Sequence, residues 1–256
     1  MSEGTVHCTT VDRVASVVFD RPEARNAMTW AMYDQLVAAC GLIAANPDVR
    51  VATFRGIGGA FAAGTDIREF LSFSGAEDGI AYEQRIEAVV CAIENLQVPT
   101  IAIIEGAAMG GGLVIATGCD FRIATPSARF GVPVARTLGN CLSLANTARL
   151  IAAFGQARVK RLLLLADSIS SEEALSCGYV AEVIEPAAID ELVTKMCRRL
   201  ASHAPITMQV AKESIRRLAK ISSQGDDLIR LTYGSNDFKA GVRAFLAKQQ
   251  AQWTGE

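Results

Sequence analysis

The chain has 256 residues, half of them hydrophobic, so it can bury a substantial core as one large domain or as a domain with a helical appendage. Its 25 basic and 27 acidic residues nearly cancel, and no broad positive surface is expected to attract nucleic acid or an anionic membrane. This length also excludes a small fold that depends on disulfides for its stability.

The first half of the chain alternates between strand and helix patterns. Val14 to Phe19 is an apolar run rich in β-branched residues, which predicts a strand, and Met32 to Ala45 repeats apolar residues at helical spacing. Buried strands are predicted again at Val51 to Phe54 and at Ile101 to Ile104, with a helix from Tyr82 to Leu96 between them. The order of elements predicts an α/β core.

Helices dominate the second half. After a short predicted strand at Phe121 to Ala124, helical spacing recurs in four segments: 158–165, 189–200, 206–218 and 238–246. No low-complexity linker separates them from the core, so we expect them to pack on it or on a neighbouring subunit. We divide the chain into a core, residues 1–200, and a C-terminal helical region, residues 201–256.

A first glycine-containing turn, Gly59 to Phe70, follows the strand that ends near Phe54. Its residues before Asp66 are mostly small, so a ligand can approach their backbone closely. Asp66 is a good helix N-cap, and Glu69 three residues later has the spacing of a capping box. Capping alone explains both side chains, and Glu69 is also a possible base.

A second turn, Glu105 to Ala116, follows the next predicted strand and contains the triplet Gly110-Gly111-Gly112. Glycines inside an element cost roughly 0.5 to 1 kcal/mol each, so a simple connection seldom uses three. They are favoured where backbone N–H groups approach a ligand, and the N-terminus of a helix leaves such groups unpaired. Two turns on successive strands can therefore aim one N–H each at a single oxygen.

Cysteine and histidine offer little further chemistry. The seven cysteines are widely spaced and never form a CxxC pair, so we expect reduced, mostly buried thiols and no metal site. His7 and His203 are the only imidazoles, too few for a histidine metal site or a Ser-His-Asp triad. The N-terminus lacks a secretory pattern and no apolar run reaches the length of a membrane span, so we expect a cytoplasmic protein with no membrane partner.

Five motifs in order resemble the enoyl-CoA hydratase/isomerase (crotonase) family. They are DRPEARNAM at 20–28, AFAAGTDIREF at 60–70, GAAMGGG at 106–112, CDFRIA at 119–124 and FGVP at 130–133. The segment DFKAGVRAFLAK at 237–248 is similar to the family's C-terminal helix, so the resemblance covers nearly the whole chain.

The resemblance implies a crotonase-like spiral of ββα units with a C-terminal α-helical trimerisation region, assembled as a homotrimer or a dimer of trimers. It places the N–H groups of an oxyanion hole at Thr65 and Gly111. It implies an acyl-CoA thioester as substrate, with coenzyme A as part of that substrate and no separate cofactor or metal. The implied ligand-binding positions are Ala24, Arg25, Ala63, Asp66 and Ile67, with Phe245 and Lys248 as further candidates.

The chain departs from the family pattern at two positions. Hydratases of the family carry one glutamate two residues after the glycine triplet and another directly after FGxP, and these residues position and activate water. This chain has Val114 and Val134 there, and neither side chain can transfer a proton. We therefore expect ordinary hydration to be impaired and isomerisation to be in doubt.

The stretch Arg136 to Ser143 contains the candidate replacements. Cys141 is a possible nucleophile facing the acyl group, and Asn140 a possible hydrogen-bond donor to it. The alternative interpretation is a buried thiol and a turn amide.

Parts of the sequence are compatible with two other functions. The spacing Gly106-x-x-x-Gly110-x-Gly112 is that of short-chain dehydrogenases, but no tyrosine in this chain is followed four residues later by lysine. A catalytically silent acyl-CoA binder fits the two valines. The sequence favours an acyl-CoA enzyme that stabilises a thioester enolate or tetrahedral oxyanion, with hydrolysis and decarboxylation as alternatives to hydration or isomerisation.

Overall fold

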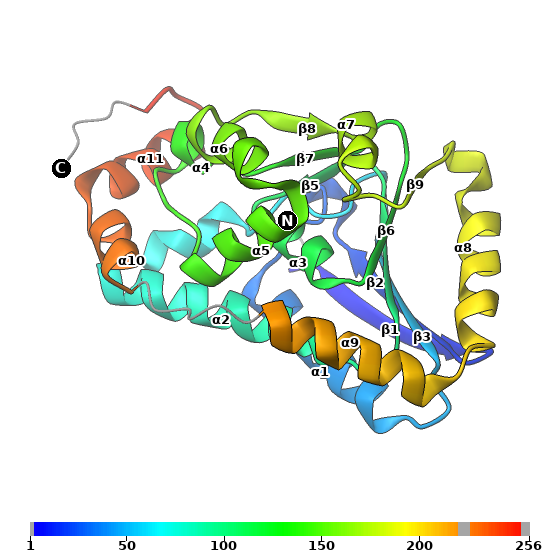
Figure 1. Ribbon diagram of the computed structural model, residues 1–256. Coiled ribbons are helices and arrows are strands. Elements are labelled where there is room, and N and C mark those ends of the chain that lie inside the picture. The colour runs from blue at the N-terminus through cyan, green and yellow to red at the C-terminus, as the bar shows by residue number, and fades with distance from the viewer. Residues whose placement is uncertain (1–2, 220–225, 252–256) are drawn as a thin grey trace.

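The computed structural model describes residues 3–219 and 226–251 (Figure 1). A six-stranded sheet forms its centre, in the order β1 (Thr5–Val11), β2 (Val14–Asp20), β3 (Val51–Gly56), β4 (Thr100–Ile104), β6 (Phe121–Ala124) and β9 (Glu182–Val183). β1 pairs antiparallel with β2, and every other pair in this sheet is parallel. The strands predicted from apolar runs are thereby confirmed.

Helices cover both faces of this sheet. Those that follow the early strands are α1 (Trp30–Ala45), α2 (Ala76–Glu94) and α3 (Gly111–Gly118), and α8 (Pro186–Ala201) lies on the opposite side of the sheet (Figure 1). Alternate residues of β4 pack on opposite faces of the sheet, because successive side chains of a strand point in opposite directions. Ile101 and Ile103 pack with Ile189 and Val193 of α8, whereas Ala102 and the other alternate residues join the main core. Burial on both faces explains the continuous apolar runs.

A second, three-stranded sheet extends the core. It contains β5 (Ala107–Met109), β7 (Arg129–Gly131) and β8 (Ser168–Ser170). Short helices surround it: α4 (Val134–Thr137), α5 (Leu144–Phe154), α6 (Gln156–Leu164) and α7 (Ser171–Ser176). Its strands have three residues each, too few to show a period in the sequence.

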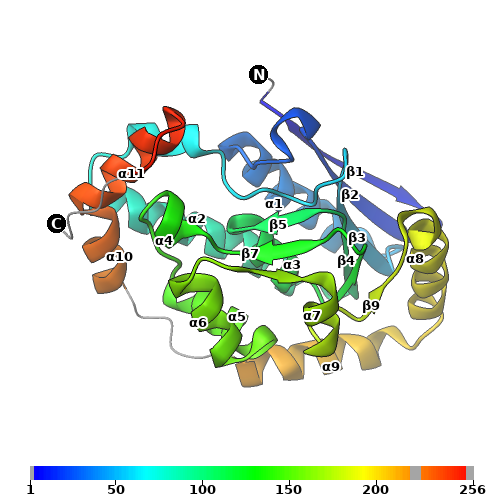
Figure 2. The same ribbon diagram turned by 90° about the horizontal axis from the view of Figure 1, so that it is seen from above.

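Three helices complete the chain: α9 (Pro205–Ala219), α10 (Asp226–Tyr233) and α11 (Asn236–Leu246). Figure 2 shows α10 and α11 at the end of the molecule far from α8, beside α2 and α4. The helices predicted in this half are confirmed, and α2 begins six residues before the predicted start, at Ala76. No helix of the described residues is long and apolar enough to cross a membrane. The boundary at residue 200 stays a prediction.

Candidate active site

Two glycine-containing turns meet at one edge of the large sheet. The first follows β3 and the second follows β4, and these strands pair in parallel, so both turns leave the same edge. Ala62 of the first turn forms a bridge with Ala108 of the second, and the Met109 N–H donates to the Ala62 carbonyl over 2.9 Å. The expectation that the two turns lie together is confirmed.

The glycine triplet permits this close approach. Gly110, the residue before α3, has φ of 50°, in the left-handed region that favours glycine. A Cβ atom on Gly112 would lie 2.3 Å from the Ala62 carbonyl oxygen, which is closer than real Cβ contacts allow. Any larger residue at position 112 would therefore push α3 away from the first turn.

The backbone N–H groups of Thr65 and Gly111 lie close to each other. A Cβ built on Gly111 would be 3.9 Å from the Thr65 nitrogen, and one built on Gly64 would be 4.0 Å from the Gly111 nitrogen. Among the described residues, no backbone carbonyl accepts a hydrogen bond from either group. Gly111 is the first residue of α3, where helical N–H groups have no partner in the helix.

Two tyrosines hold the Thr65 side chain. Thr65 Oγ1 is 2.7 Å from the Tyr33 hydroxyl and 2.9 Å from the Tyr82 hydroxyl. Burial raises the pKa of both tyrosines well above its ordinary value, so both hydroxyls stay protonated at neutral pH. They can therefore orient Thr65 but cannot serve as bases.

Aromatic side chains form a wall around this threonine, which we call the aromatic wall. It is assembled from α1, η2 (Ile67–Ser72), α2, α10 and α11, with ring centroids 4.8 to 6.3 Å apart. Its members are Trp30, Tyr33, Phe70, Phe73, Tyr82, Tyr233 and Phe238. Most of these rings are buried, and electrostatic interactions are stronger in such apolar surroundings than in water.

Glu83 is a site candidate that sequence reasoning missed. It lies on α2 with 3% of its surface exposed. Oε2 accepts the Ser143 N–H over 2.8 Å, and Oε1 accepts the Tyr233 hydroxyl over 3.2 Å. Burial raises the pKa of Glu83 to about 7, although these hydrogen bonds oppose the shift. The sequence does indicate that Glu83 is buried, because it lies three residues from both Ile80 and Ile86, in the apolar stripe of the helix.

The candidates Asn140 and Cys141 lie beside this carboxyl group. Asn140 Nδ2 donates to the Tyr233 hydroxyl over 3.2 Å, and its Oδ1 has no hydrogen-bond partner in the described residues although it is buried. Cys141 is half-buried against the core, and its carbonyl is 3.4 Å from the Tyr233 hydroxyl. Their catalytic roles stay predictions.

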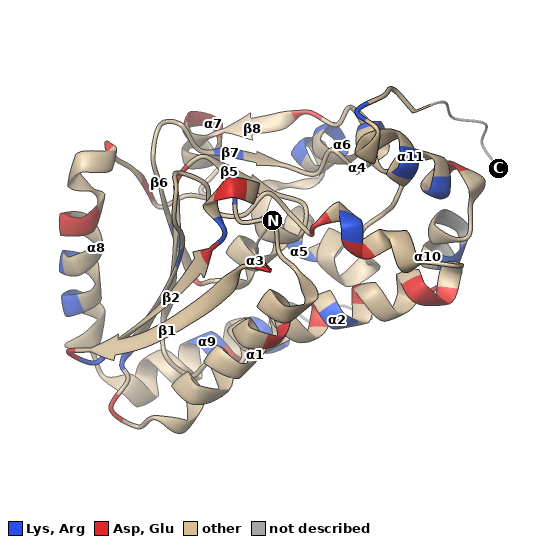
Figure 3. Ribbon diagram, turned by 180° about the vertical axis from the view of Figure 1, so that it is seen from behind, with Lys and Arg blue, Asp and Glu red and all other residues tan. Residues whose placement is uncertain are grey.

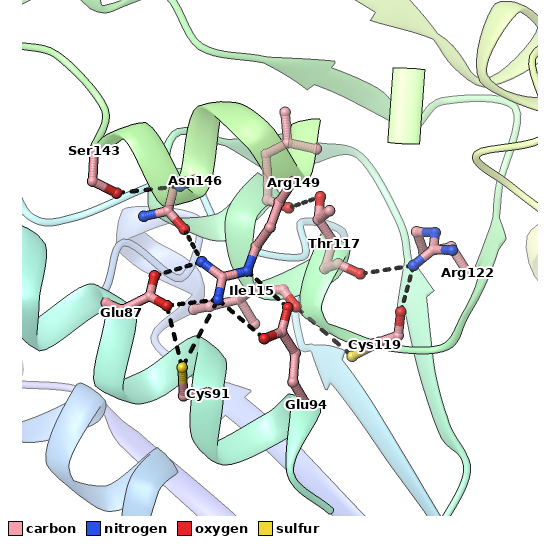
Figure 4. A network of polar contacts seen from close by, with 12 residues as sticks. Glu87, Cys91, Glu94, Ile115, Thr117, Cys119, Arg122, Ser143, Asn146 and Arg149 are labelled. Atoms are coloured by element: carbon pink, nitrogen blue, oxygen red, sulfur yellow. Dashed lines mark hydrogen bonds and ion pairs between the residues drawn. The ribbon is translucent and has the colours of Figure 1, made fainter. Parts of the chain in front are cut away.

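An ion-pair network fixes the other side of this region (Figure 4). Arg149 pairs with Glu87 and Glu94 of α2 and donates to Asn146 Oδ1 over 3.0 Å. Arg149 thereby orients the Asn146 carboxamide with its Nδ2 away from the guanidinium group. The Asn146 side chain in turn lowers the pKa of Glu83 as a hydrogen-bonding neighbour of that carboxyl group.

Comparison with known proteins identifies the family. A family model described as Enoyl-CoA hydratase/isomerase matches residues 9–256. The chain belongs to this family. A short-chain-enoyl-CoA hydratase of Clostridium acetobutylicum is 33% identical, with 94% of each chain covered. The methylmalonyl-CoA decarboxylase of Escherichia coli is 28% identical over the full length of both chains.

The solved structures confirm the crotonase fold. A methylmalonyl-CoA decarboxylase in complex with 2-nitronate-propionyl-CoA superposes with a TM-score of 0.90 at 26% identity, covering 98% of this chain and 99% of that one. The predicted α/β class, with its crotonase-like core, is therefore correct, and the resemblance read from the motifs is confirmed. The chain is a crotonase-family CoA-thioester enzyme, like the hydratases and the decarboxylase it matches.

Val114 and Val134, the two positions at which the motifs predict the hydratase glutamates, both pack against the main core. Val114 is on the first turn of α3, three residues after Gly111, and is fully buried. Val134 begins α4 and packs against the same core cluster. Neither position can supply a proton-transfer group.

Two of the candidate coenzyme A positions frame the first turn. Ala24 ends the short helix η1 (Pro22–Ala24), and the exposed Arg25 after it accepts a hydrogen bond at its carbonyl from the Ala63 N–H over 3.0 Å. Arg25 has φ of 49°, which presents its carbonyl to the turn. These three residues therefore form one backbone surface beside Thr65.

The Asp66 carboxylate holds two arginines and caps a short helix. Its carboxylate pairs with the fully buried Arg21 over 2.7 Å and with Arg68 over 2.5 Å. Burial alone would raise the pKa of Asp66, but hydrogen bonds from these two arginines lower it well below its usual range. The capping-box prediction was wrong: Asp66 caps η2, but Glu69 accepts the Trp30 N–H because the Asp66 N–H is already bonded to the Met28 carbonyl.

The remaining candidates lie on or next to η2 and α11, two elements that contribute to the aromatic wall. Ile67 begins η2 and packs half-buried against the core. Phe245, near the end of α11, is 43% exposed, and Lys248 follows this helix with φ of 55°. Within residues 3–219 and 226–251, no cluster of His, Cys, Asp and Glu has an arrangement that could hold a metal ion.

Proposed function

We propose that the protein binds an acyl-CoA thioester and polarises its carbonyl between the N–H groups of Thr65 and Gly111. The observation that carries the proposal is the pair of neighbouring N–H groups, one of them at a helix N-terminus, without backbone acceptors among the described residues. Such groups stabilise the negative oxygen of a thioester enolate or of a tetrahedral intermediate. One donor of this kind is typically worth about 10² to 10³ in rate.

Coenzyme A would lie along the backbone of Ala24, Arg25 and Ala63, next to Asp66 and Ile67. This surface supports the proposal because it continues directly from Thr65 and includes the exposed Arg25 side chain, which can face a phosphate. Phe245 and Lys248 are the further contacts. No separate cofactor or metal is needed for carbonyl polarisation, and we place the protein in the cytoplasm.

Ordinary enoyl-CoA hydration is expected to be weak. General acid and base groups typically contribute about 10² to 10⁴ in rate, and Val114 and Val134 supply neither. The family name alone would suggest a hydratase or isomerase, but the valines argue against the usual activation of water.

Decarboxylation is the second candidate reaction. When a malonyl-type thioester loses carbon dioxide, the electrons of the broken C–C bond form the enolate, so no base has to remove a proton. Apolar side chains such as Val114 and Val134 also favour loss of a carboxylate, because they leave its charge unsolvated. The high structural similarity to a methylmalonyl-CoA decarboxylase supports this candidate.

Self-association as a homotrimer or a dimer of trimers is part of the proposal. Four apolar side chains of α9 are largely exposed in the single chain: Ile206, Val210, Ile215 and Leu218. Exposed apolar groups concentrated on one helix are typical of an interface.

A panel of thioesters tests the proposed function. The purified protein is incubated in deuterated buffer with saturated, 2-enoyl, 3-enoyl and malonyl-type CoA thioesters, and products are followed by mass spectrometry. We expect deuterium uptake or loss of carbon dioxide without hydration; thioester cleavage would indicate a hydrolase. Hydration of crotonyl-CoA at ordinary family rates would contradict the account of the valines, and binding without any turnover would favour a catalytically silent acyl-CoA binder.

A further inference from the structure

A buried polar cluster, which we call the Glu83 cluster, lies within the aromatic wall. It brings together three segments: α2, the stretch that leads into α5, and α10 near the C-terminus. Its members are Glu83, Asn140, Ser143, Asn146 and Tyr233. Burying a carboxyl group costs several kcal/mol unless hydrogen bonds compensate, so the contacts of Glu83 decide how the cluster holds it.

The hydrogen bonds of the cluster run in one direction. Asn140 Nδ2 donates to the Tyr233 hydroxyl, and this hydroxyl donates to Glu83 Oε1, each over 3.2 Å. The Ser143 N–H, at the N-cap of α5, donates to Oε2 over 2.8 Å. Every described contact on the carboxyl oxygens therefore suits a carboxylate that accepts hydrogen bonds.

One polar atom of the cluster points to an additional partner. Asn140 Oδ1 is buried and has no hydrogen-bond partner among the described residues. The Asn140 side chain belongs to a residue that is only 9% exposed. An unpaired buried polar group costs about 1 to 3 kcal/mol, so such groups are rare unless a ligand group satisfies them.

The cluster is continuous with the proposed oxyanion site. Tyr82, the residue before Glu83, contacts Thr65 Oγ1 with its hydroxyl, and its ring centroid is 6.1 Å from that of Tyr233. The charge of Glu83 also influences Tyr33, which contacts the same threonine oxygen. Tyr33 and Tyr82 therefore connect the Thr65 turn to the Glu83 cluster.

We propose that Glu83 is the proton-transfer group for an acyl-CoA whose thioester oxygen is held by Thr65 and Gly111, in place of the carboxylates absent at Val114 and Val134. This inference rests on the proposed function. Tyr233 positions the carboxylate through its hydroxyl, and Asn140 orients that hydroxyl.

The step balances without a further reagent. Glu83 Oε takes the proton from the carbon next to the thioester carbonyl, the C–H bond breaks, and its electron pair forms the C=C bond of the enolate. The negative charge moves to the thioester oxygen between the two N–H groups. In the reverse direction, and after loss of carbon dioxide from a malonyl-type thioester, the protonated Glu83 returns a proton to the same carbon.

Burial brings the pKa of Glu83 close to neutral pH, where a carboxylate can both accept and return a proton. Burial raises its pKa to about 7, and a base is most effective when its pKa lies near the working pH. The titratable groups that face it are Tyr33 of α1, Tyr82 of α2, Tyr233 of α10 and Cys141 before α5. Burial raises the pKa of all three tyrosines.

Deuterium exchange into propionyl-CoA tests this inference in the full chain. Mass spectrometry follows exchange at the carbon next to the carbonyl, and calorimetry measures binding of the same thioester separately. We expect Glu83→Gln to lose about 10²- to 10⁴-fold in exchange rate while it still binds, and Glu83→Asp to recover part of the rate. Glu191→Gln makes the same change at an exposed carboxylate of α8, on the opposite side of the large sheet; it is the matched control and should exchange like the wild type.

The pH profile gives an independent readout that needs no variant. Wild-type exchange should rise from about pH 5 and level off above about pH 8, because the carboxylate is the active form. A flat profile, or a Glu83→Gln variant that exchanges like Glu191→Gln, would overturn the inference. A wild type that binds propionyl-CoA without exchange would overturn the role of Glu83 alone, whereas a wild type that binds no thioester would overturn the proposed function as well.

Discussion

At the scale of single residues, the Gly111 N–H is the oxyanion donor that a substitution can remove. Replacing Gly111 with proline removes its N–H at the first position of a helix, where proline is otherwise well tolerated. We predict that Gly111→Pro loses about 10²- to 10³-fold in turnover or exchange relative to Gly111→Ala. The alanine variant is the control because both carry a Cβ, which would lie 2.7 Å from the Tyr33 hydroxyl, while only alanine keeps the N–H. Equal rates for the two variants would contradict the oxyanion assignment.

The raised pKa of Glu83 predicts that the free energy of unfolding depends on pH. Its pKa is about 7 when folded and ordinarily 4.5, so the folded protein binds more protons than the unfolded chain between these values. Stability is therefore fully present below about pH 4.5 and is lost as pH rises through 7, by roughly 3 kcal/mol for this shift. In urea unfolding, Glu83→Gln should lose less stability than the wild type from about pH 5 to about pH 8. Parallel pH dependences would show that the carboxyl group has no raised pKa.

At the scale of elements, the packing of α3 on the first turn is the critical contact. Gly112→Ala should lose about 1 to 3 kcal/mol in urea unfolding, because its Cβ would collide with the Ala62 carbonyl. Gly41→Ala provides the contrast: Gly41 lies inside α1 with no atom near its Cβ position, so this variant should gain about 0.5 to 1 kcal/mol. A neutral Gly112→Ala would mean that α3 does not need this close approach.

The elements differ in how well sequence alone predicted them. β2, β3, β4 and β6 are apolar runs buried on both faces or nearly so, and each was predicted within two residues at each end. β1 was missed because its residues are mostly exposed and polar, and β5, β7, β8 and β9 are too short to show a period.

The site was predictable only in part. Thr65 and Gly111 follow from motifs that are contiguous in sequence, and the structure brings their nitrogens together. The Glu83 cluster combines residues up to 150 positions apart, as in the contact between Glu83 and Tyr233, so only the fold reveals it. The capping-box prediction was wrong for a similar reason, because the Glu69 carboxylate accepts a hydrogen bond from Trp30, which lies 39 residues earlier.

At the scale of the whole molecule, charge gives little guidance to partners, since acidic and basic residues are interspersed along α2 and α8 (Figure 3). Exposed apolar groups are more informative. We predict that the double variant Ile215→Glu with Leu218→Glu sediments as a smaller species than the wild type, because these α9 side chains are 69% and 88% exposed in the single chain. Val11→Glu, at the end of β1, is the control and should leave the sedimentation coefficient unchanged. A wild type that sediments as a monomer would rule out the proposed trimer.

The most direct test of the central claim is the infrared carbonyl stretch of propionyl-CoA labelled with ¹³C at the thioester carbon. Two N–H donors at Thr65 and Gly111 withdraw electron density from the C=O bond, so the account predicts a lower frequency for the bound thioester than for the free one. The shift should be smaller in Gly111→Pro than in Gly111→Ala. A bound thioester with the same frequency as the free molecule would contradict the proposal that these two groups polarise the carbonyl.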